Sequence, residues 1–316
     1  MSSSAPRATA DATSPGPAPT PARPALGGAV WAALGIVYVV WGSTYLAIRV
    51  AVETMPPFLS ASARFFAAAP LLALLLLWRQ GPAALRVTGR QLGSAVVVGL
   101  LLLVGGNGLV VLAERSVPSG LTALLVASVP LWVVLLNLST GRRPPLATLA
   151  GVLLGLVGLA VLTSPGLSGE VRLSGLLSVV LAALIWAFGS FLAGKLEMPA
   201  NPMAASVYEM FAAGVGALLL AVLRGEPQHF ELAAVSTRSW LALAYLCSFG
   251  SLIAFTAYAW LLQRAPLSLV ATYAYVNPVV AVVLGWLVLA EPLTWPVLLG
   301  GAIVVSGVFL VVRAER

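Results

Sequence analysis

Two ionisable side chains, Arg64 and Glu209, lie inside long apolar segments of the sequence, 57–78 and 202–223. A charged side chain at the centre of a bilayer costs at least about 2.5 kcal/mol on insertion scales, so such residues usually face away from lipid. Each is the eighth residue of its segment, about 12 Å from the segment's start. We expect both side chains to point into a bundle interior or a wet cavity, where they offer charge recognition or proton transfer.

Three interpretations of this pair remain open. In the first, both side chains lie near helix ends, reach the interface and bond to loop carbonyls. In the second, they line a solute cavity, with Arg64 meeting an anionic group and Glu209 an amine. In the third, Glu209 binds and releases a proton and so couples solute movement to protons, a role that buried carboxylic acids can fill.

Aromatic and amide side chains inside apolar segments are further candidates for the cavity wall: Tyr38, Trp41, Tyr45, Asn107, Trp186, Tyr275 and Asn277. The first three are spaced by three and four residues and therefore share one helix face. Aromatic side chains in a membrane also serve lipid contact or simple packing, and amides also bond between helices. If they line a cavity, they favour planar or amphipathic solutes and offer a surface on which a cation can stack.

The elements that must position these residues are membrane-spanning helices. The 316 residues are 60% hydrophobic and only 9% charged, whereas soluble domains carry roughly 25% charged residues. Ten apolar segments have about the length that crosses a bilayer as a helix, and Gly or Pro marks most of the breaks between them. Their predicted bounds are 29–51, 57–78, 91–113, 117–138, 145–163, 173–196, 202–223, 237–262, 266–289 and 294–312.

The ten segments form two related sets of five. A shift of 145 residues places Trp41 on Trp186 and Phe66 on Phe211, and it equates Arg64 with Glu209. A shift of 148 residues places Pro130 on Pro278 in the later part. Because five is odd, the second set enters the membrane from the opposite side. We therefore predict an all-α integral membrane fold of ten helices in two inverted five-helix repeats, with a site between the halves near mid-membrane.

The positions of lysine and arginine predict the orientation. With the N-terminus in the cytoplasm, the inner segments carry eleven Lys or Arg residues and the outer segments five, with Arg64 inside a helix. This bias predicts that both termini are cytoplasmic. Residues 1–28 are rich in Pro, Ala, Ser and Thr, and we expect a disordered cytoplasmic tail. The excess of arginine over lysine and the abundant alanine suggest a GC-rich bacterial genome, so we expect a bacterial inner-membrane protein.

Several kinds of chemistry are disfavoured. The sequence contains no Gly-rich GK[ST] phosphate loop, and one histidine with one cysteine cannot form a zinc site or a disulfide. We expect no metal, no cofactor and no catalytic residues. The net charge of +7 is spread over separate loops, which argues against nucleic-acid binding. Glycine stripes in segments 145–163 and 294–312 favour close helix packing, with a homodimer contact as the alternative.

Four stretches together resemble the EamA family of the drug/metabolite transporter superfamily: WGSTYLAIR from Trp41, SARF from Ser62, VPSGLTALLVASVP from Val117 and LAEPLT from Leu289. The resemblance covers about residues 29–312. It implies a ten-helix carrier, built from EamA-like repeats at 29–163 and 173–312, that moves small metabolites, often outward. The chain departs from the family in one place, because Gly141-Arg142 stands where a Gly-Glu pair often follows the fourth helix.

The residues and the resemblance together predict a secondary transporter that uses no ATP and exports a small metabolite or drug by alternating access. Its solutes would include amino acids or related amphipathic compounds, selected inside the cavity because the loops are short. A channel or facilitative pore is one alternative. An integral-membrane enzyme or assembly subunit is the other.

Overall fold

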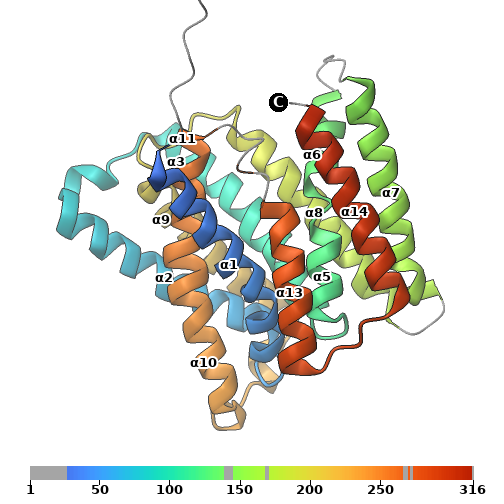
Figure 1. Cartoon of the computed structure of the whole chain (residues 1–316). Helices are drawn as coiled ribbons and strands as arrows, with labels where there is room; N and C mark the ends of the chain where they lie inside the picture. The colour runs from blue at the N-terminus through green and yellow to red at the C-terminus, as the bar shows by residue number, and fades with distance from the viewer. Residues whose placement is uncertain (1–26, 139–144, 168–170, 266–269, 271–272, 315–316) are drawn as a thin grey trace, which may run out of the picture.

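The computed structural model of the chain describes residues 27–138, 145–167, 171–265, 270 and 273–314. These ranges are helical and contain no β-strand. Figure 1 shows that the first turns of helix α1 (Gly28–Ala51) and the last turns of helix α14 (Trp295–Ala314) lie at the same end of the bundle. The described chain therefore returns to the side from which it starts.

The other long helices are α2 (Pro57–Gln80), α7 (Leu146–Leu167), α8 (Leu173–Ala193), α9 (Pro202–Leu223) and α13 (Tyr273–Leu289). The shorter elements are α3 (Gly89–Gly99), η2 (Leu100–Gly106), α4 (Asn107–Ala113), α5 (Ser119–Val126), α6 (Val129–Leu138), α10 (Thr237–Tyr245), η5 (Leu246–Phe255) and α11 (Thr256–Arg264). Three 3₁₀ turns complete them: η1 (Pro82–Leu85), η3 (Glu226–His229) and η4 (Leu232–Ala234).

Seven helical stretches among the described residues have the length and hydropathy of a membrane span. They coincide with the predicted segments that begin at residues 29, 57, 91, 117, 173, 202 and 237. The other three predicted segments contain shorter apolar stretches: Leu146–Leu162, Val276–Leu289 and Trp295–Gly307. Residues 266–269 and 271–272, where one of these segments was expected to begin, lie outside the described residues. The predicted all-helical fold is confirmed.

Local sequence signals explain where several helices begin. Pro57 is the first residue of α2 and Pro202 the first of α9, positions where the missing N–H costs nothing. Thr88 Oγ1 accepts a hydrogen bond from the Gln91 backbone N–H at 3.2 Å, and the Gln91 side chain accepts from the Thr88 N–H at 3.0 Å. This reciprocal capping box fixes the start of α3.

Two membrane-spanning helices contain π-helical segments, η2 and η5. Segment η2 ends at Gly105-Gly106. Segment η5 lies at the corresponding place in the second half, because the shift of 145 residues places Gly105 on Gly250. A π-helical segment changes the direction of the side chains that follow it, and such segments are frequent at functional sites.

Two helix pairs join parts of the chain that are far apart in sequence. Helices α2 and α9 run antiparallel, with Phe66 against Phe211 at a centroid distance of 5.8 Å and Ser62 Oγ donating to the Gly214 carbonyl at 3.0 Å. Helices α7 and α14 also lie side by side (Figure 1), and their glycines face each other. The two glycine stripes are therefore used within one chain, so they do not offer the homodimer contact considered above.

The glycine contact between α7 and α14 makes a testable prediction. A Cβ atom at Gly307 would lie 2.6 Å from the Gly155 nitrogen and 2.7 Å from the Gly151 carbonyl oxygen. Because both neighbours are backbone atoms, Gly307→Ala should destabilise the fold by about 1–3 kcal/mol. The measurement is the thermal unfolding midpoint in detergent, followed by tryptophan fluorescence.

Gly35→Ala is the matched control, because nothing lies within 4 Å of a Cβ atom at Gly35 in helix α1. Alanine has the higher helix propensity, by up to about 1 kcal/mol, so this variant should unfold at or above the wild-type temperature. Equal midpoints for the two variants would contradict the close α7–α14 contact.

Candidate functional site

A pocket at the centre of the bundle collects most of the predicted site residues. Its lining comes from helices α1, α2, α4, α5, α8, α9 and α13 and the two π-helical segments, and its volume is about 70 Å³. Drug-sized ligand sites measure roughly 300–1,000 Å³, so this pocket is smaller than such a site. Its lining includes six of the residues that the sequence predicts: Trp41, Tyr45, Arg64, Asn107, Trp186 and Asn277.

Arg64 supplies the positive charge of the pocket. Its side chain is only 7% exposed, and its Nε donates a hydrogen bond to Ser251 Oγ at 2.8 Å. Gly250 makes room for the guanidinium, since a Cβ atom there would come within 3.0 Å of Arg64 Nη2. No carboxylate lines the pocket, and none pairs with Arg64 in the part of the chain that the structure describes. The guanidinium is therefore a buried charge held by a neutral partner.

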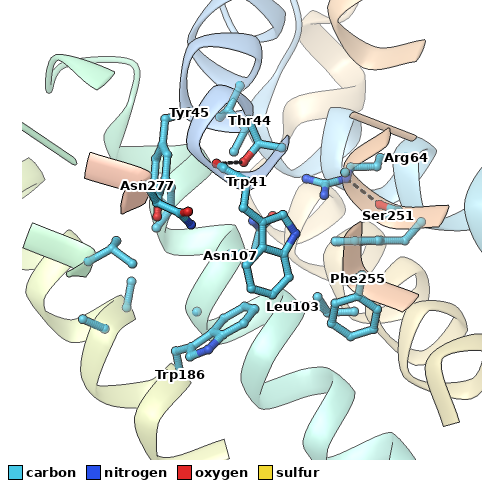
Figure 2. Close-up of a pocket in the computed structure, with 18 of the residues that line it drawn as sticks. Trp41, Thr44, Tyr45, Arg64, Leu103, Asn107, Trp186, Ser251, Phe255 and Asn277 are labelled. Atoms are coloured by element: carbon cyan, nitrogen blue, oxygen red, sulfur yellow. Dashed lines mark hydrogen bonds between the residues drawn. The ribbon is translucent and has the colours of Figure 1, made fainter. Parts of the chain in front are cut away.

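Aromatic rings form one wall of the pocket. The Trp41 ring lies 5.9 Å from Trp186, 4.7 Å from Tyr258 and 5.4 Å from Tyr273, measured between centroids. Figure 2 shows Trp41 in the middle of the pocket, with Arg64 on one side and Asn277 on the other. Trp41 precedes Tyr45 in α1, so this aromatic wall lies toward the end of the bundle where α1 begins. It separates the pocket from that end.

Two amide side chains provide neutral polar groups. The Asn277 amide donates to the backbone carbonyls of Tyr38 and Tyr273, at 3.1 and 3.2 Å. These bonds tie helix α13 to α1 at the edge of the pocket. The amide oxygen of Asn107 is buried and has no hydrogen-bond partner among the described residues. It is therefore available to accept a hydrogen bond from a solute.

Three of the predicted site residues are not among the residues that line the pocket. Glu209 is buried in α9 at 6% exposure, and it makes no ion pair with Arg64 although α2 and α9 are in contact. Tyr38 lies one turn beyond the pocket and contributes its backbone carbonyl to Asn277. The side chain of Tyr275 lies outside the described residues.

The pocket is also lined by residues that were not predicted from the sequence, including Thr44, Gly250, Ser251 and Phe255. The internal repeat could have found two of them. The shift of 145 residues that places Trp41 on Trp186 also places Gly105-Gly106 on Gly250-Ser251. Thr44 and Phe255 carry no comparable signal, because a lone threonine or phenylalanine in an apolar helix is ordinary.

At the end of the bundle away from the aromatic wall, Glu291 joins two helices. Its carboxylate accepts hydrogen bonds from the backbone N–H groups of Ser119 and Gly120, at 2.8 and 3.1 Å, and from Ser119 Oγ at 2.9 Å. The negative charge thus caps the N-terminus of α5. Glu291 lies just after α13, so these bonds join the end of α13 to the start of α5.

A second acidic residue at a helix end, Glu114, is fully buried. It lies just beyond the stretch Gly89–Ala113, and both carboxylate oxygens lack a hydrogen-bond partner among the described residues. Burial raises the pKa of Glu114 well above its ordinary value, and nearby Glu291 raises it further. The Arg49 guanidinium, which donates to the Glu114 backbone carbonyl, opposes this effect. Glu114 is therefore a neutral acid at pH values where exposed glutamates are charged.

A helical bundle of membrane-spanning segments that encloses a small amphipathic pocket at its centre is the architecture of a membrane transport protein. The model of the EamA-like transporter family matches residues 27–164 and 173–313, and the chain belongs to this family. The predicted resemblance is confirmed. The protein is accordingly a membrane transporter whose solutes are small molecules.

Named relatives agree with this assignment. The chain is 40% identical over 259 residues to the "Uncharacterized inner membrane transporter YedA" of Escherichia coli strain K12, covering 81% of each protein. It is 27% identical to the "Uncharacterized transporter YoaV" of Bacillus subtilis strain 168, over 88% of this chain and 95% of that protein. A crystal structure at 21% identity matches 92% of this chain and all of its own length with a TM-score of 0.64, which shows the shared fold.

The buried acid Glu114 makes a prediction about pH. Its folded-state pKa is raised above the ordinary value of 4.5. The stability it contributes is complete below that value and is lost as pH rises through the folded-state pKa. The wild-type unfolding midpoint should therefore fall relative to that of Glu114→Gln as the pH rises from about 5 upward.

The unfolding midpoints of the two proteins are compared in detergent across this pH range. Glu197→Gln, at an exposed glutamate, should keep a constant offset from wild type. A constant offset for Glu114→Gln as well would show that the Glu114 carboxyl is already charged in the fold.

Proposed function

We propose that the protein is a secondary transporter, independent of ATP, that exports a small metabolite or drug across the bacterial inner membrane by alternating access. In this proposal, residues 29–163 and 173–312 form two inverted five-helix repeats, and the ten helices cross the membrane with both termini in the cytoplasm. The central pocket is the solute site. The name of the relative YedA, an inner membrane transporter, supports the location.

The observation that carries this proposal is the meeting of residues that the internal repeat equates. Trp41 contacts Trp186 and Phe66 contacts Phe211, and both pairs are separated by 145 positions. When two halves are related by a two-fold axis, a residue meets its own equivalent only near that axis. The pocket lies beside the Trp41–Trp186 pair, where an inverted-repeat carrier is expected to bind its solute.

Closure on both sides of the pocket favours a carrier over a channel. The aromatic wall of Trp41, Trp186, Tyr258 and Tyr273 separates it from one end of the bundle. The bonds of Glu291 to α5, and of Arg49 to the Glu114 carbonyl, hold helices together toward the other end. A pocket of about 70 Å³ must open toward one side to admit a metabolite. The aromatic lining and the free amide oxygen of Asn107 favour amino acids or related amphipathic compounds.

The carrier proposal predicts trans-stimulated exchange. Purified protein in liposomes, loaded with unlabelled solute, should accelerate uptake of the same labelled solute at least several-fold. The solute is first chosen from a panel of labelled aromatic and aliphatic amino acids and drug-like compounds. A channel would pass the label without acceleration, and protein-free liposomes give the background. If the rate of labelled uptake does not depend on the internal solute, the protein is a facilitative pore and not a carrier.

Coupling to protons through Glu209 is a separate part of the proposal. Glu209 is buried in α9 without an ion-pair partner among the described residues. Glu209→Gln keeps the shape of the side chain but cannot release a proton. The variant should therefore lose uptake driven by a pH gradient while keeping exchange at equal pH. The exposed Glu197 provides the control Glu197→Gln. Full gradient-driven uptake by Glu209→Gln would exclude Glu209 as the proton carrier.

A further inference from the structure

A second hollow lies at the end of the bundle beyond the pocket. It has a volume of about 870 Å³ and lies between α1, α4 and the start of α8, with the end of α9 at its rim. Its charged lining residues are four arginines, Arg49, Arg115, Arg172 and Arg224, and three serines are beside them. No carboxylate is among the described lining residues. We call this hollow the arginine cleft.

The positive charges of the cleft arginines are not neutralised by carboxylates among the described residues. Arg115, Arg172 and Arg224 are exposed, and none of the four forms an ion pair with a carboxylate in the described ranges. Arg49 donates to the Glu114 backbone carbonyl, and Arg224 lies 5.8 Å from the Phe58 ring, so both are held without being neutralised. A cleft lined by charges of one sign focuses the field and raises the local concentration of opposite charges.

Acidic residues near the cleft are engaged elsewhere or lie in a separate hollow. The adjoining hollow, which shares Arg115 and Arg224, contains Glu53, Glu226 and Glu231. Glu226 accepts hydrogen bonds from the Leu59 and Phe58 backbone N–H groups, at 2.9 and 3.3 Å, and caps the start of α2. The Glu114 carboxylate is fully buried and is not part of the cleft lining.

The same helices connect the cleft to the central pocket. Along α1, Tyr45 lines the pocket and Arg49 the cleft; along α8, Ala182 lines the pocket and Ser178 the cleft. These steps of four residues correspond to about 6 Å along a helix. The cleft is therefore about one helical turn from the pocket that contains Arg64. The arginines of the cleft and Arg64 therefore lie along one path from the surface to the central pocket.

We propose that the transported solute carries an anionic group, which Arg64 binds in the pocket and which enters or leaves through the arginine cleft. The proposal rests on the carrier function proposed above. Two separate observations point to the same chemistry: a buried guanidinium without a carboxylate partner, and a four-arginine cleft one turn away. Such a group is a carboxylate or a phosphate, on a solute small and apolar enough to pack against Trp41 and Trp186. A lipid phosphate is the other source of negative charge for the cleft.

The first test compares three probes that differ only in the charged end: 3-phenylpropionate, 3-phenylpropionamide and 3-phenylpropylamine. Binding to purified protein in neutral detergent is followed by tryptophan fluorescence, because Trp41 and Trp186 line the pocket. The carboxylate should bind at least about tenfold more tightly than the amide or the amine, as expected for a desolvated charge-assisted bond. Arg64→Gln should remove this preference, and Arg90→Gln, at an exposed arginine, should retain it.

Equal binding of the carboxylate and the amide by wild-type protein would overturn the proposal and leave the carrier function intact. Conversely, a carboxylate preference without any trans-stimulated exchange would overturn the carrier function while supporting the anionic site. The two ideas therefore fail in different ways.

The second test concerns the cleft. The double variant Arg115→Gln/Arg172→Gln should lower the initial rate of uptake of the anionic probe by about tenfold at low salt, with a smaller loss at high salt. Arg238→Gln is the matched control, because Arg238 is exposed and is not in the cleft lining. The rates are measured in liposomes of phosphatidylcholine alone and in liposomes that contain phosphatidylglycerol.

A loss in both lipid mixtures supports a solute path through the cleft. A loss only when phosphatidylglycerol is present would assign the cleft to a lipid headgroup and overturn this part of the proposal. An unchanged rate in both mixtures would also overturn it.

Discussion

A buried guanidinium in an apolar bundle is the constraint on which the centre of this protein depends. An isolated charge away from water is costly, and among the described residues the hydrogen-bonding side-chain partner of Arg64 is the hydroxyl of Ser251, at 2.8 Å. The surroundings reduce this cost in specific ways. The π-helical segment η5 presents Gly250 and Ser251 to the guanidinium, and the Phe65 ring lies 5.2 Å from it. The Arg64 guanidinium keeps a full positive charge that these contacts do not compensate. This charge is the strongest interaction that the pocket offers to a solute.

In the proposed arrangement of two inverted repeats, a two-fold relation between the halves accounts for the central position of this site. Trp41 and Trp186 occupy equivalent positions and meet each other, so one aromatic contact joins the two halves beside the pocket. The halves are nevertheless chemically unequal, since the repeat equates Arg64 with Glu209 and only Arg64 lines the pocket. A second inequality concerns Glu291, which caps α5 at one end of the bundle, because the position 148 residues earlier is an arginine, Arg143, which lies outside the described residues.

The sequence predicted those features that depend on local pattern. Apolar length and Pro or Gly breaks located the helices, and the cost of a buried charge identified Arg64. Features that depend on tertiary contacts were not predictable. Glu114 and Glu291 lie at helix ends, where charged residues usually meet water, and only the packing of α4, α5 and α13 buries one and makes the other a cap. The position of Glu209 in its segment predicts its depth in the membrane. The direction of its side chain depends on the rotation of α9 against α2, and residue spacing does not determine that rotation. Ser251 reaches Arg64 from a π-helical segment, a geometry that has no clear signature in side-chain pattern.

In the proposed export, the charge of the solute decides how much energy the transport step requires. Inside-negative membrane potentials favour outward movement of a negative charge by about 2.3 kcal/mol per 100 mV. A solute with a net negative charge would therefore leave the cell down the electrical gradient, and a carrier with only Arg64 and the arginine cleft would suffice. A zwitterion such as an amino acid gains nothing from the potential, because its two charges move together. Export of a zwitterion against its gradient would need a coupled ion, and Glu209, buried in α9 away from the pocket lining, is where a proton could bind without competing with the solute for Arg64. In the proposed carrier, net solute charge and proton coupling are thus linked, since export of a net anion would not need a proton on Glu209, whereas export of a zwitterion against its gradient would need a group of that kind.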